Sequence, residues 1–322
     1  DVVIVGAGIA GLAAALAAAK SGASVLLMEQ ENHLGGRSPV DGGEVEGQPA
    51  QDWIDATTKT LEAMPNVRIR TRMMGAGVYD HGYLLGYERL TDHAPDLAGP
   101  RHRLWRIRAK RIVTATGAIE RPLSFAGNDV PGVMLAGAVR DYAVNHGVSV
   151  GDRVVVATNN DDAYRTAIAL KQAGLEVPVV IDARNEANGA LPTKAREMGI
   201  RVETGKGISS VYGGKKVTAV GICSQAGEGA KTDEVACDAV AMSGGWSPVV
   251  HLWSHCGGKL NWDTDYAMFR PDPTRPPLGA DGAGFVLAAG TANGHMSADA
   301  AIADAHAVGL RAAEEAGHSP SD

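Results

Sequence analysis

Three glycines near the start of the chain constrain its fold more than any other feature. Gly6, Gly8 and Gly11 stand at the spacing Gly-x-Gly-x-x-Gly. They separate an apolar segment of strand type, residues 1–5, from an Ala- and Leu-rich segment, residues 12–20, that predicts a helix. The first glycine allows a tight turn, the second lets a diphosphate approach the backbone, and the third lets helix and strand pack closely. The segment therefore predicts a nucleotide-binding β-α-β unit.

The residues around this turn support the same prediction. At the start of the helix, Ile9 and Ala10 offer unpaired N–H groups and the positive end of the helix dipole to a phosphate. Residues 24–28 form the next apolar strand, and Glu29 and Gln30 follow at its end. A carboxylate there accepts the hydroxyls of an adenosine ribose and repels a 2′-phosphate. We expect FAD or NAD rather than NADP. The alternative, a glycine-rich turn that holds no nucleotide, explains this ordered context less well.

Two later segments are candidates for contacts with the same nucleotide. Gly36, Arg37 and Ser38 suit a loop that folds back over the dinucleotide, with the Arg37 guanidinium available to the diphosphate. The alternative for Arg37, about equally supported, is a solvated loop cation. Further along, backbone near Val78 lies in a predicted antiparallel excursion, where it could pair with an adenine edge.

Two further strands are predicted to end beside this site. Residues 112–117 are apolar and close on Ala115, Thr116 and Gly117, which bring bare backbone near the dinucleotide. A strand near the end of the chain closes on Gly290, and a long Ala-rich helix follows it. We therefore add these residues to the candidate site.

A second β-α-β pattern, over residues 152–181, repeats the periodicity of residues 1–29. Its turn, Thr-Asn-Asn-Asp-Asp at 158–162, contains no glycine, so side chains occupy the space that a diphosphate would need. Asp161 and Asp162 stand at the predicted start of the helix, where we expect them to cap its N–H groups and to repel an anion. The second nucleotide site is therefore predicted not to bind NAD(P)H.

Composition excludes several classes of function. The chain has 322 residues and a formal net charge of -7, which does not suit nucleic-acid binding. No apolar stretch of about 20 residues is present, so no membrane span is expected. The three cysteines form no Cys-x-x-Cys pair and fit a reducing cytoplasm, and His251, His255, Cys256 and His295 match no zinc pattern. No catalytic residue is expected in this chain. The cysteines are Cys223, Cys237 and Cys256.

These patterns predict an α/β protein with an FAD/NAD(P)-binding Rossmann-like three-layer fold and a second, nested nucleotide-binding-like domain. The first domain is expected to be discontinuous, at residues 1–122 and 245–322, and the degenerate second domain to cover residues 123–244. Residues 252–277 are expected to be an irregular excursion. Because the chain begins on the first residue of a core strand, we expect a piece of a longer polypeptide or a trimmed start.

Taken together, these residues resemble the two-dinucleotide-binding-domain flavoproteins. Within that group, the segments Thr-Ala-Thr-Gly-Ala-Ile-Glu-Arg-Pro-Leu (114–123), Ala-Gly-Asn-Asp-Val-Pro-Gly-Val-Met-Leu (126–135) and the glycine-free second turn (155–164) are similar to the α subunit of heterotetrameric sarcosine oxidase. The resemblance covers essentially the whole chain. Relatives include the α subunits of dye-linked proline dehydrogenase, hydrogen cyanide synthase and opine oxidases.

The resemblance implies a cytoplasmic αβγδ enzyme that oxidatively demethylates sarcosine to glycine, with transfer of the one-carbon unit to tetrahydrofolate and of electrons to oxygen. It implies NAD (or FAD) at the first site, FAD and the sarcosine site on the β subunit, and a covalent FMN at the interface with that subunit. The isolated chain is expected to be inactive. The residues implied to hold the dinucleotide are Gly6, Gly8, Gly11, Glu29, Arg37, Ala115, Thr116, Gly117 and Gly290.

The chain departs from this family's pattern in two respects. The ferredoxin-like and folate-binding regions of the family's α subunits have no counterpart here, and Thr291 replaces the aspartate of the flavoprotein Ala-Gly-Asp fingerprint, which makes FAD less expected. Alternatives are a stand-alone FAD-dependent NAD(P)H oxidoreductase of the disulfide-reductase superfamily, the α subunit of a related amine, proline or opine dehydrogenase, and a scaffold protein with a structural nucleotide.

Overall fold

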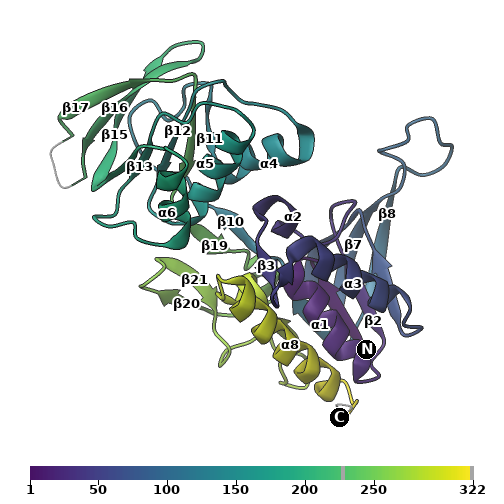
Figure 1. Cartoon of the computed structure of the whole chain (residues 1–322). Coiled ribbons are helices and arrows are strands. Elements are labelled where there is room, and N and C mark those ends of the chain that lie inside the picture. Colours follow the sequence, from purple (N-terminus) through teal and green to yellow (C-terminus); the bar gives the residue numbers. More distant parts are fainter. Residues whose placement is uncertain (226–228, 320–322) are drawn as a thin grey trace. The chain divides into compact units, whose positions relative to one another are not determined.

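The computed structural model describes residues 1–225 and 229–319. The chain divides into two compact units, each with its own hydrophobic core (Figure 1). Unit 1 consists of Asp1–Ile119 and Ser247–Asp322, and unit 2 consists of Glu120–Trp246. The short strands β10 (Ala118–Glu120) and β19 (Trp246–Pro248) lie where the chain passes from one unit to the other.

Unit 1 is built on a five-stranded parallel sheet. Its strands lie in the order β22 (Val286–Ala288), β9 (Arg111–Thr114), β1 (Val2–Val5), β2 (Val25–Met28) and β5 (Val67–Arg70). In β1, Val2 pairs with Val25 on one side and with Arg111 on the other. All four residues of β1 are buried, because both faces of a parallel sheet are covered and its strands are accordingly apolar throughout.

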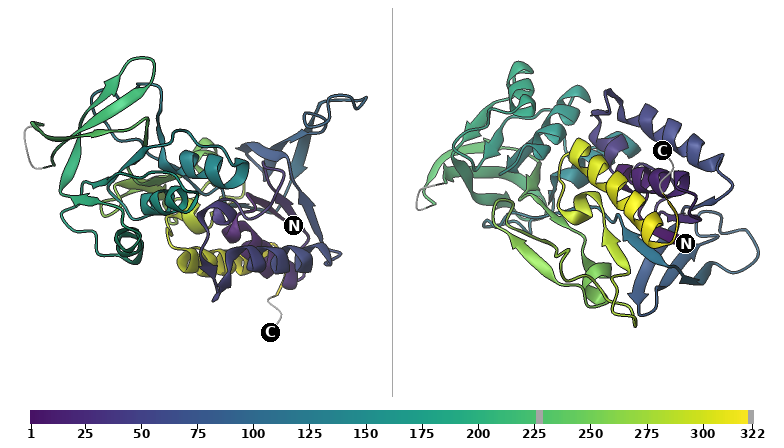
Figure 2. Two further views of the ribbon diagram at one scale, coloured as in Figure 1. Left: turned by 45° about the horizontal axis from the view of Figure 1, so that its top comes forward. Right: turned by 90° about the horizontal axis from the view of Figure 1, so that it is seen from below.

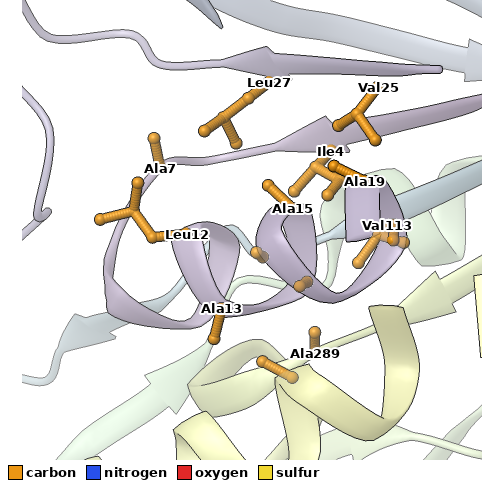
Figure 3. Close-up of a cluster of buried hydrophobic side chains, with 14 of the residues drawn as sticks. Ile4, Ala7, Leu12, Ala13, Ala15, Ala19, Val25, Leu27, Val113 and Ala289 are labelled. Atoms are coloured by element: carbon orange, nitrogen blue, oxygen red, sulfur yellow. The ribbon is translucent and has the colours of Figure 1, made fainter. Parts of the chain in front are cut away.

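Helices cover one face of this sheet: α1 (Ile9–Lys20), α3 (Ala50–Glu62) and α8 (Ala298–Glu315). Figure 3 shows Ala15 and Ala19 of α1 lying toward the strand residues Ile4 and Val25. Alanine lets α1 lie close to its neighbours, and a Cβ on Gly309 of α8 would overlap the backbone of α1. In both views of Figure 2, the yellow α8 runs beside the purple α1.

A three-stranded antiparallel sheet covers the other face. It consists of β6 (Met73–Tyr79), β7 (Tyr83–Arg89) and β8 (His102–Arg108), in that order. Val3 and Val5 of β1 pack here against Val78 and Leu84, whereas Ile4 points to the helices. Successive side chains of β1 thus point alternately to the helices and to the antiparallel sheet, so unit 1 has three layers with the parallel sheet in the middle.

The remaining elements of unit 1 are short. They are α2 (Ser38–Asp41), β3 (Glu44–Val45), β4 (Gln48–Pro49), α7 (His251–His255), β20 (Leu260–Asp263), β21 (Met268–Pro271) and the 3₁₀ helix η1 (Gly290–Asn293). The expectation of an irregular segment over 252–277 is wrong, because β20 and β21 form a regular antiparallel hairpin there. The Trp262 and Phe269 rings, with centroids 4.9 Å apart, form a cross-strand pair that stabilises this hairpin. The composition of the segment does not reveal this pairing.

Unit 2 repeats the three-layer arrangement. Its parallel sheet has the order β11 (Val133–Leu135), β18 (Ala239–Ser243), β12 (Val154–Thr158), β13 (Val180–Asp182) and β14 (Val202–Thr204). One face carries α4 (Ala136–His146), α5 (Asp162–Gln172) and α6 (Ala190–Glu197). The other carries the antiparallel strands β15 (Lys206–Gly213), β16 (Val217–Ser224) and β17 (Lys231–Ala236). β17 is not anticipated from the sequence, because its charged residues obscure the alternation.

The layered α/β architecture predicted from the sequence is therefore confirmed. None of the helices in the described part of the chain is long and apolar enough to span a membrane.

Candidate dinucleotide-binding site

The turn from β1 into α1 is tight because two of its glycines have no room for a side chain. Gly6 has φ +100°, a region that favours glycine. A Cβ on Gly6 would overlap the carbonyl oxygen of Ala115, and a Cβ on Gly11 would overlap the carbonyl oxygen of Gly6. Both positions hold strand and helix together, as the spacing predicts.

Gly8 differs from these two glycines because the space beside it is open. Its backbone, with φ −65° and ψ 179°, suits any residue. The nearest neighbour of a Cβ at this position would be the Gly36 Cα, 3.9 Å away. The Gly35 N–H donates to the Ala7 carbonyl oxygen at 2.8 Å, which fixes the second loop against the turn. The bare backbones of Gly8 and Gly36 therefore lie side by side.

The N-terminus of α1 has backbone N–H groups from which a bound anion could accept hydrogen bonds. The first hydrogen bond of the helix runs from the Leu12 N–H to the Gly8 carbonyl oxygen at 2.9 Å, so the N–H groups of Ile9, Ala10 and Gly11 precede the ladder. Within the described chain, no side chain caps α1 and its first turn contains no acidic residue. The partial positive charge of the helix end is thus available to a phosphate.

Glu29 lies directly after β2 and carries a buried carboxylate, 6% exposed. Its Oε2 accepts the Ala7 N–H at 2.8 Å, and its Oε1 accepts the Glu31 N–H at 2.9 Å. Each oxygen keeps a further acceptor position, since a carboxylate has about four lone-pair sites. The acid is therefore fixed beside the turn and keeps acceptor positions free of these two bonds.

We expect the Glu29→Gln variant to lose discrimination between the two nicotinamide dinucleotides. The amide keeps an acceptor oxygen for the Ala7 N–H but removes the charge that would repel a 2′-phosphate. The ratio of the dissociation constants for NADP and NAD should fall by at least about tenfold, equivalent to about 1.4 kcal/mol. Titration calorimetry with both nucleotides measures it, and an unchanged ratio would remove Glu29 from this role.

Three predicted residues are engaged in other contacts. The Arg37 guanidinium forms an ion pair with Asp41 at 2.9 Å, which competes with any diphosphate for it. The Ser38 N–H donates to the Gly35 carbonyl oxygen at 3.2 Å, so Ser38 helps to shape the loop. Gln30 is exposed, and its carbonyl oxygen accepts a hydrogen bond from Arg89 at 2.5 Å.

Val78 belongs to β6, whose first residue lies against the end of β2. The Met73 N–H donates to the Glu29 carbonyl oxygen at 2.7 Å. The Val78 side chain itself is buried in the core between the two sheets, so only its backbone is a candidate for contact with an adenine. A register irregularity between Gly75 and Gly77 precedes it.

The two later strand ends meet the first turn from other sides. Ala115 donates its N–H to the Val5 carbonyl oxygen at 2.9 Å, and the Thr116 hydroxyl donates to the Val249 carbonyl oxygen at 2.7 Å. Gly117 and Gly290 both have positive φ, +75° and +65°. A Cβ on Gly290 would overlap the Ala10 side chain. The fold thus gathers four separate segments at the start of α1.

Asp304 of α8 is a member of this group that sequence reasoning missed. Its Oδ2 accepts the Gly290 N–H at 2.7 Å, and its Oδ1 accepts an N–H of the Asn293 amide at 3.0 Å and lies 3.3 Å from His295 Nε2. The sequence places a carboxylate in an Ala-rich helix but does not show that it faces this loop. An acid from α8 thus lies against the loop in which position 291 carries threonine instead of the fingerprint aspartate.

The second turn, residues 158–162, is filled by its own side chains. The Asn160 amide donates to the Ser243 hydroxyl at 3.0 Å, and the Asn159 amide donates to the Gly244 carbonyl oxygen at 3.4 Å. The Asp162 N–H donates to the Asn160 side-chain oxygen at 3.0 Å. In the first turn, the corresponding position is Gly8, which has no side chain. In the second turn, this position is occupied by amide side chains that are hydrogen-bonded to the end of β18.

The expected capping by Asp161 is wrong. In the described part of the chain, the Asp161 side chain accepts no N–H of the first turn of α5, and Asp162 is the first residue of that helix. Asp161 forms an ion pair with Arg184 at 2.8 Å, and Asp162 forms one with Arg140 at 3.0 Å. The guanidiniums displace the capping bonds because charged pairs are stronger. The turn is therefore less negative than the sequence suggests, and the prediction that it binds no diphosphate rests on its packing more than on its charge.

Asp182, at the tip of β13, occupies the place in unit 2 that Glu29 has in unit 1. It is fully buried, and it accepts hydrogen bonds from the Tyr164 hydroxyl at 2.8 Å and from Arg184 at 2.7 Å. Burial, followed by the bond to Asp182, raises the pKa of Tyr164. These internal partners take the acceptor positions that a ribose would use.

A family model described as pyridine nucleotide-disulphide oxidoreductase matches residues 1–267. The chain belongs to the pyridine nucleotide-disulphide oxidoreductase family. The chain therefore has the Rossmann-like fold of FAD/NAD-type dinucleotide-binding proteins. Its family also places it among the oxidoreductases.

Two curated members are similar over most of the chain. The alpha subunit of sarcosine oxidase from Corynebacterium sp. (strain P-1) is 42% identical over 98% of the chain and 33% of its own length. That from Rhizobium meliloti (strain 1021) is 39% identical over 84% of the chain and 26% of its own length. The chain thus spans about a third or less of these relatives. An opine oxidase subunit from Agrobacterium tumefaciens (strain Ach5) is 25% identical over 94% of the chain and 65% of that protein.

Two solved structures share the fold of the chain. L-Proline dehydrogenase from P. horikoshii has a TM-score of 0.74 at 23% identity and covers 100% of the chain, which matches 56% of that structure. Thioredoxin reductase from T. acidophilum has a TM-score of 0.70 at 21% identity, with 98% of the chain and 97% of that structure covered.

The cysteines of this pyridine nucleotide-disulphide oxidoreductase family member are not arranged for disulfide exchange. Cys223, Cys237 and Cys256 are all free, and the first two are buried. Burial raises the pKa of the Cys237 thiol to about 12 and that of the Cys256 thiol to about 11. Disulfide exchange needs an attacking thiolate and a second thiol beside it. In the described residues, no three His, Cys, Asp or Glu side chains form a candidate metal site.

We expect the Cys256 thiol to react slowly with iodoacetamide. Because its pKa is raised, its thiolate fraction at pH 8 should be more than about 100-fold lower than that of an ordinary thiol, and it should rise tenfold per pH unit up to about pH 11. Mass-spectrometric alkylation rates between pH 7 and 10 measure this fraction. A rate like that of glutathione at pH 8 would contradict the expectation.

Proposed function

We propose that the chain is the dinucleotide-binding portion of the α subunit of a sarcosine-oxidase-type flavoenzyme complex, which oxidatively demethylates sarcosine to glycine. The identity of 39–42% with proteins named as alpha subunits of sarcosine oxidase supports this proposal. Because the chain matches only part of those relatives, their whole activity, substrate and partners enter here as part of the proposal.

In this proposal, residues 1–122 and 245–322 form the domain that holds one NAD or FAD, and residues 123–244 form a degenerate NAD-binding-like domain. The open backbone at Gly8 accepts the diphosphate, and Glu29 accepts the ribose hydroxyls. A bound NAD or FAD supplies a ring that accepts a hydride. The residues of this chain hold and orient the adenylate and diphosphate and carry no bond-making step. The nucleotide-contacting set is that predicted from the sequence, with the Arg37 guanidinium shared with Asp41.

The contrast between the two turns is the observation that carries the proposal. The first is bare at Gly8, whereas Asn159 and Asn160 fill the second. A stand-alone reductase of the disulfide-reductase superfamily needs a second working site to receive NAD(P)H. The filled second turn and the raised thiol pKa values therefore favour a subunit that holds one nucleotide.

The partners in this proposal are the β, γ and δ subunits of a cytoplasmic heterotetramer, with an FMN at the interface with the β subunit. No residue of this chain is assigned to that FMN. The isolated chain is expected not to oxidise sarcosine, because its described residues offer no cluster that we can assign as a general base next to a substrate.

A visible-absorption spectrum of the purified chain and analysis of the nucleotide released on denaturation test the proposal. We expect one NAD or FAD per chain and no reduction of the sample by NADH. A yellow chain whose flavin NADH reduces would support the stand-alone reductase instead. Oxidation of sarcosine by the chain without added β subunit would contradict the assignment of the substrate site to another subunit.

A further inference from the structure

A cavity of about 540 Å³ lies in unit 1 beside the loop that follows β22. Its volume is within the range of small-molecule sites. One wall is the β20–β21 hairpin with the residues that follow it, and the other is the end of η1 (Figure 1 labels β20 and β21). The lining residues differ from those of the candidate dinucleotide set. The polar ones are Asn261, Arg270, Asp272, Thr274, Asn293 and His295.

The hairpin wall presents hydrogen-bond donors. Asn261 and Arg270 are directly opposite in the register of the two strands, so their side chains share one face. The Asn261 side-chain oxygen accepts from Arg275 at 3.5 Å, which leaves its NH₂ group as a donor. In the described part of the chain, the Arg270 guanidinium has one ion pair, with Asp263, whose carboxylate lies 3.8 Å from Nε, farther than a hydrogen bond reaches. Arg270 can therefore form the bidentate pair that a guanidinium makes with a carboxylate.

The carboxylates near Arg270 are engaged by other groups. Asp272 Oδ1 accepts the Thr274 N–H at 2.9 Å and the Thr274 hydroxyl at 2.7 Å, and its Oδ2 accepts from Arg275 Nε at 2.6 Å. Asp263 Oδ1 accepts two backbone N–H groups, each at 3.1 Å. Arg275 thus balances the charge of Asp272, whereas Asp263 offsets Arg270 only at a longer distance.

The opposite wall presents hydrogen-bond acceptors in front of a carboxylate. The Asn293 amide donates to Asp304 Oδ1 at 3.0 Å, which leaves the Asn293 side-chain oxygen for another donor. His295 Nε2 lies 3.3 Å from the same Asp304 oxygen. When Nε2 carries the proton, Nδ1 of the neutral ring is an acceptor. Because Asp304 adds a negative charge behind these two side chains, this wall suits a positively charged N–H donor.

We propose that this cavity binds a zwitterionic amino acid. Its carboxylate pairs with Arg270 and Asn261, and its ammonium group donates to Asn293 and His295. The two arginines and the two carboxylates at the hairpin wall are equal in number, so a ligand without net charge matches the site better than a dianion such as phosphate. The inference goes beyond the proposed function and does not depend on it, because no nucleotide contact uses these side chains.

A ligand-observed NMR titration of the purified chain with glycine tests the proposal. Acetate and methylammonium, which each carry one of the two charged groups, are the comparison ligands. Glycine should bind with a dissociation constant of about 1–10 mM, as expected for a ligand with so few atoms. Acetate and methylammonium should each bind at least about tenfold more weakly, since each meets only one of the two walls.

Variants of the hairpin wall test the contact with the carboxylate. Arg270→Gln removes the guanidinium and should weaken glycine binding by at least about tenfold. The matched control is Arg311→Gln, because Arg311 is also an exposed arginine of unit 1 with an ion pair, to Glu315 at 2.7 Å, and lies on α8 outside the cavity. The control should leave the affinity within about twofold of that of the unvaried chain. Thermal unfolding checks that both variants fold.

A variant of the opposite wall tests the contact with the ammonium group. His295→Phe keeps a ring but removes its nitrogens. It should lower the ratio of the affinities for glycine and acetate by at least about threefold, because only glycine carries the ammonium group. A merely structural effect of the substitution would weaken the binding of both ligands alike and would contradict this contact.

Further outcomes would overturn the inference. They are no saturation by glycine at about 100 mM, equal affinities for glycine and acetate, and undiminished glycine binding by Arg270→Gln. Asp304 also accepts the Gly290 N–H, so the titration is repeated with saturating NAD. Unchanged glycine binding would support a separate site, whereas displacement of glycine would make the cavity part of the dinucleotide site. The proposed function stands in each of these cases.

Discussion

Replacing Gly8 with aspartate is expected to abolish dinucleotide binding while leaving the fold intact. The backbone at Gly8 has ordinary φ and ψ values, and the space for a Cβ is open, so the variant should fold. Its carboxylate would lie where a diphosphate approaches, and like charges about 4 Å apart at a protein surface repel by about 4 kcal/mol. We expect the dissociation constant for NAD to rise at least about 100-fold.

The matched control for this variant is Gly214→Asp. Gly214 also has open space around a Cβ, and it lies in the β15–β16 turn of unit 2, which is part of neither nucleotide turn. Calorimetry should give unchanged NAD affinity for the control, and thermal unfolding should show both variants folded. Undiminished NAD binding by Gly8→Asp would show that the diphosphate does not pass this residue.

Replacing Arg140 with methionine is expected to destabilise unit 2 by about 1–3 kcal/mol, the cost of leaving hydrogen-bonded polar groups without their partner. The Arg140 side chain is 1% exposed and donates to the Asp162 carboxylate and to the Asp162 carbonyl oxygen, each at 3.0 Å. Its removal leaves the Asp162 carboxylate, 24% exposed, with less compensation. Urea unfolding monitored by circular dichroism measures the free energy of unfolding.

Arg165→Met is the matched control, because Arg165 also forms an ion pair with Asp162, at 3.5 Å, but is 35% exposed. Exposed ion pairs contribute about 1 kcal/mol or less, so this variant should lose little stability. Equal losses for the two variants would contradict the view that burial makes the Arg140 ion pair with Asp162 stronger than the Arg165 pair. Neither variant should change the affinity of the first turn for NAD.

The first β-α-β unit is predictable because its information is local. Three glycines in six residues fix the turn from β1 to α1, and β2 and Glu29 follow within one short segment. The same local reasoning finds the glycine-free second turn. Whether the predicted nucleotide contacts form remains a prediction, which the Gly8 and Glu29 variants address.

The features that sequence reasoning missed depend on contacts between distant residues. Asp304 reaches the loop at Gly290 only because α8 packs along α1. Asp162 stands beside a helix start, where capping is the local expectation, but Arg140 from the preceding helix takes its carboxylate. The spacing of residues in the sequence predicts neither the Asp304–Gly290 contact nor the Asp162–Arg140 ion pair.

An experimental structure of the chain crystallised with NAD tests the central claim most directly. The account predicts a diphosphate against Gly6 to Gly11, with the ribose hydroxyls on Glu29 and the turn at residues 158–162 still closed by the amides of Asn159 and Asn160. A nucleotide lying against residues 159–162, with the first turn empty, would contradict it.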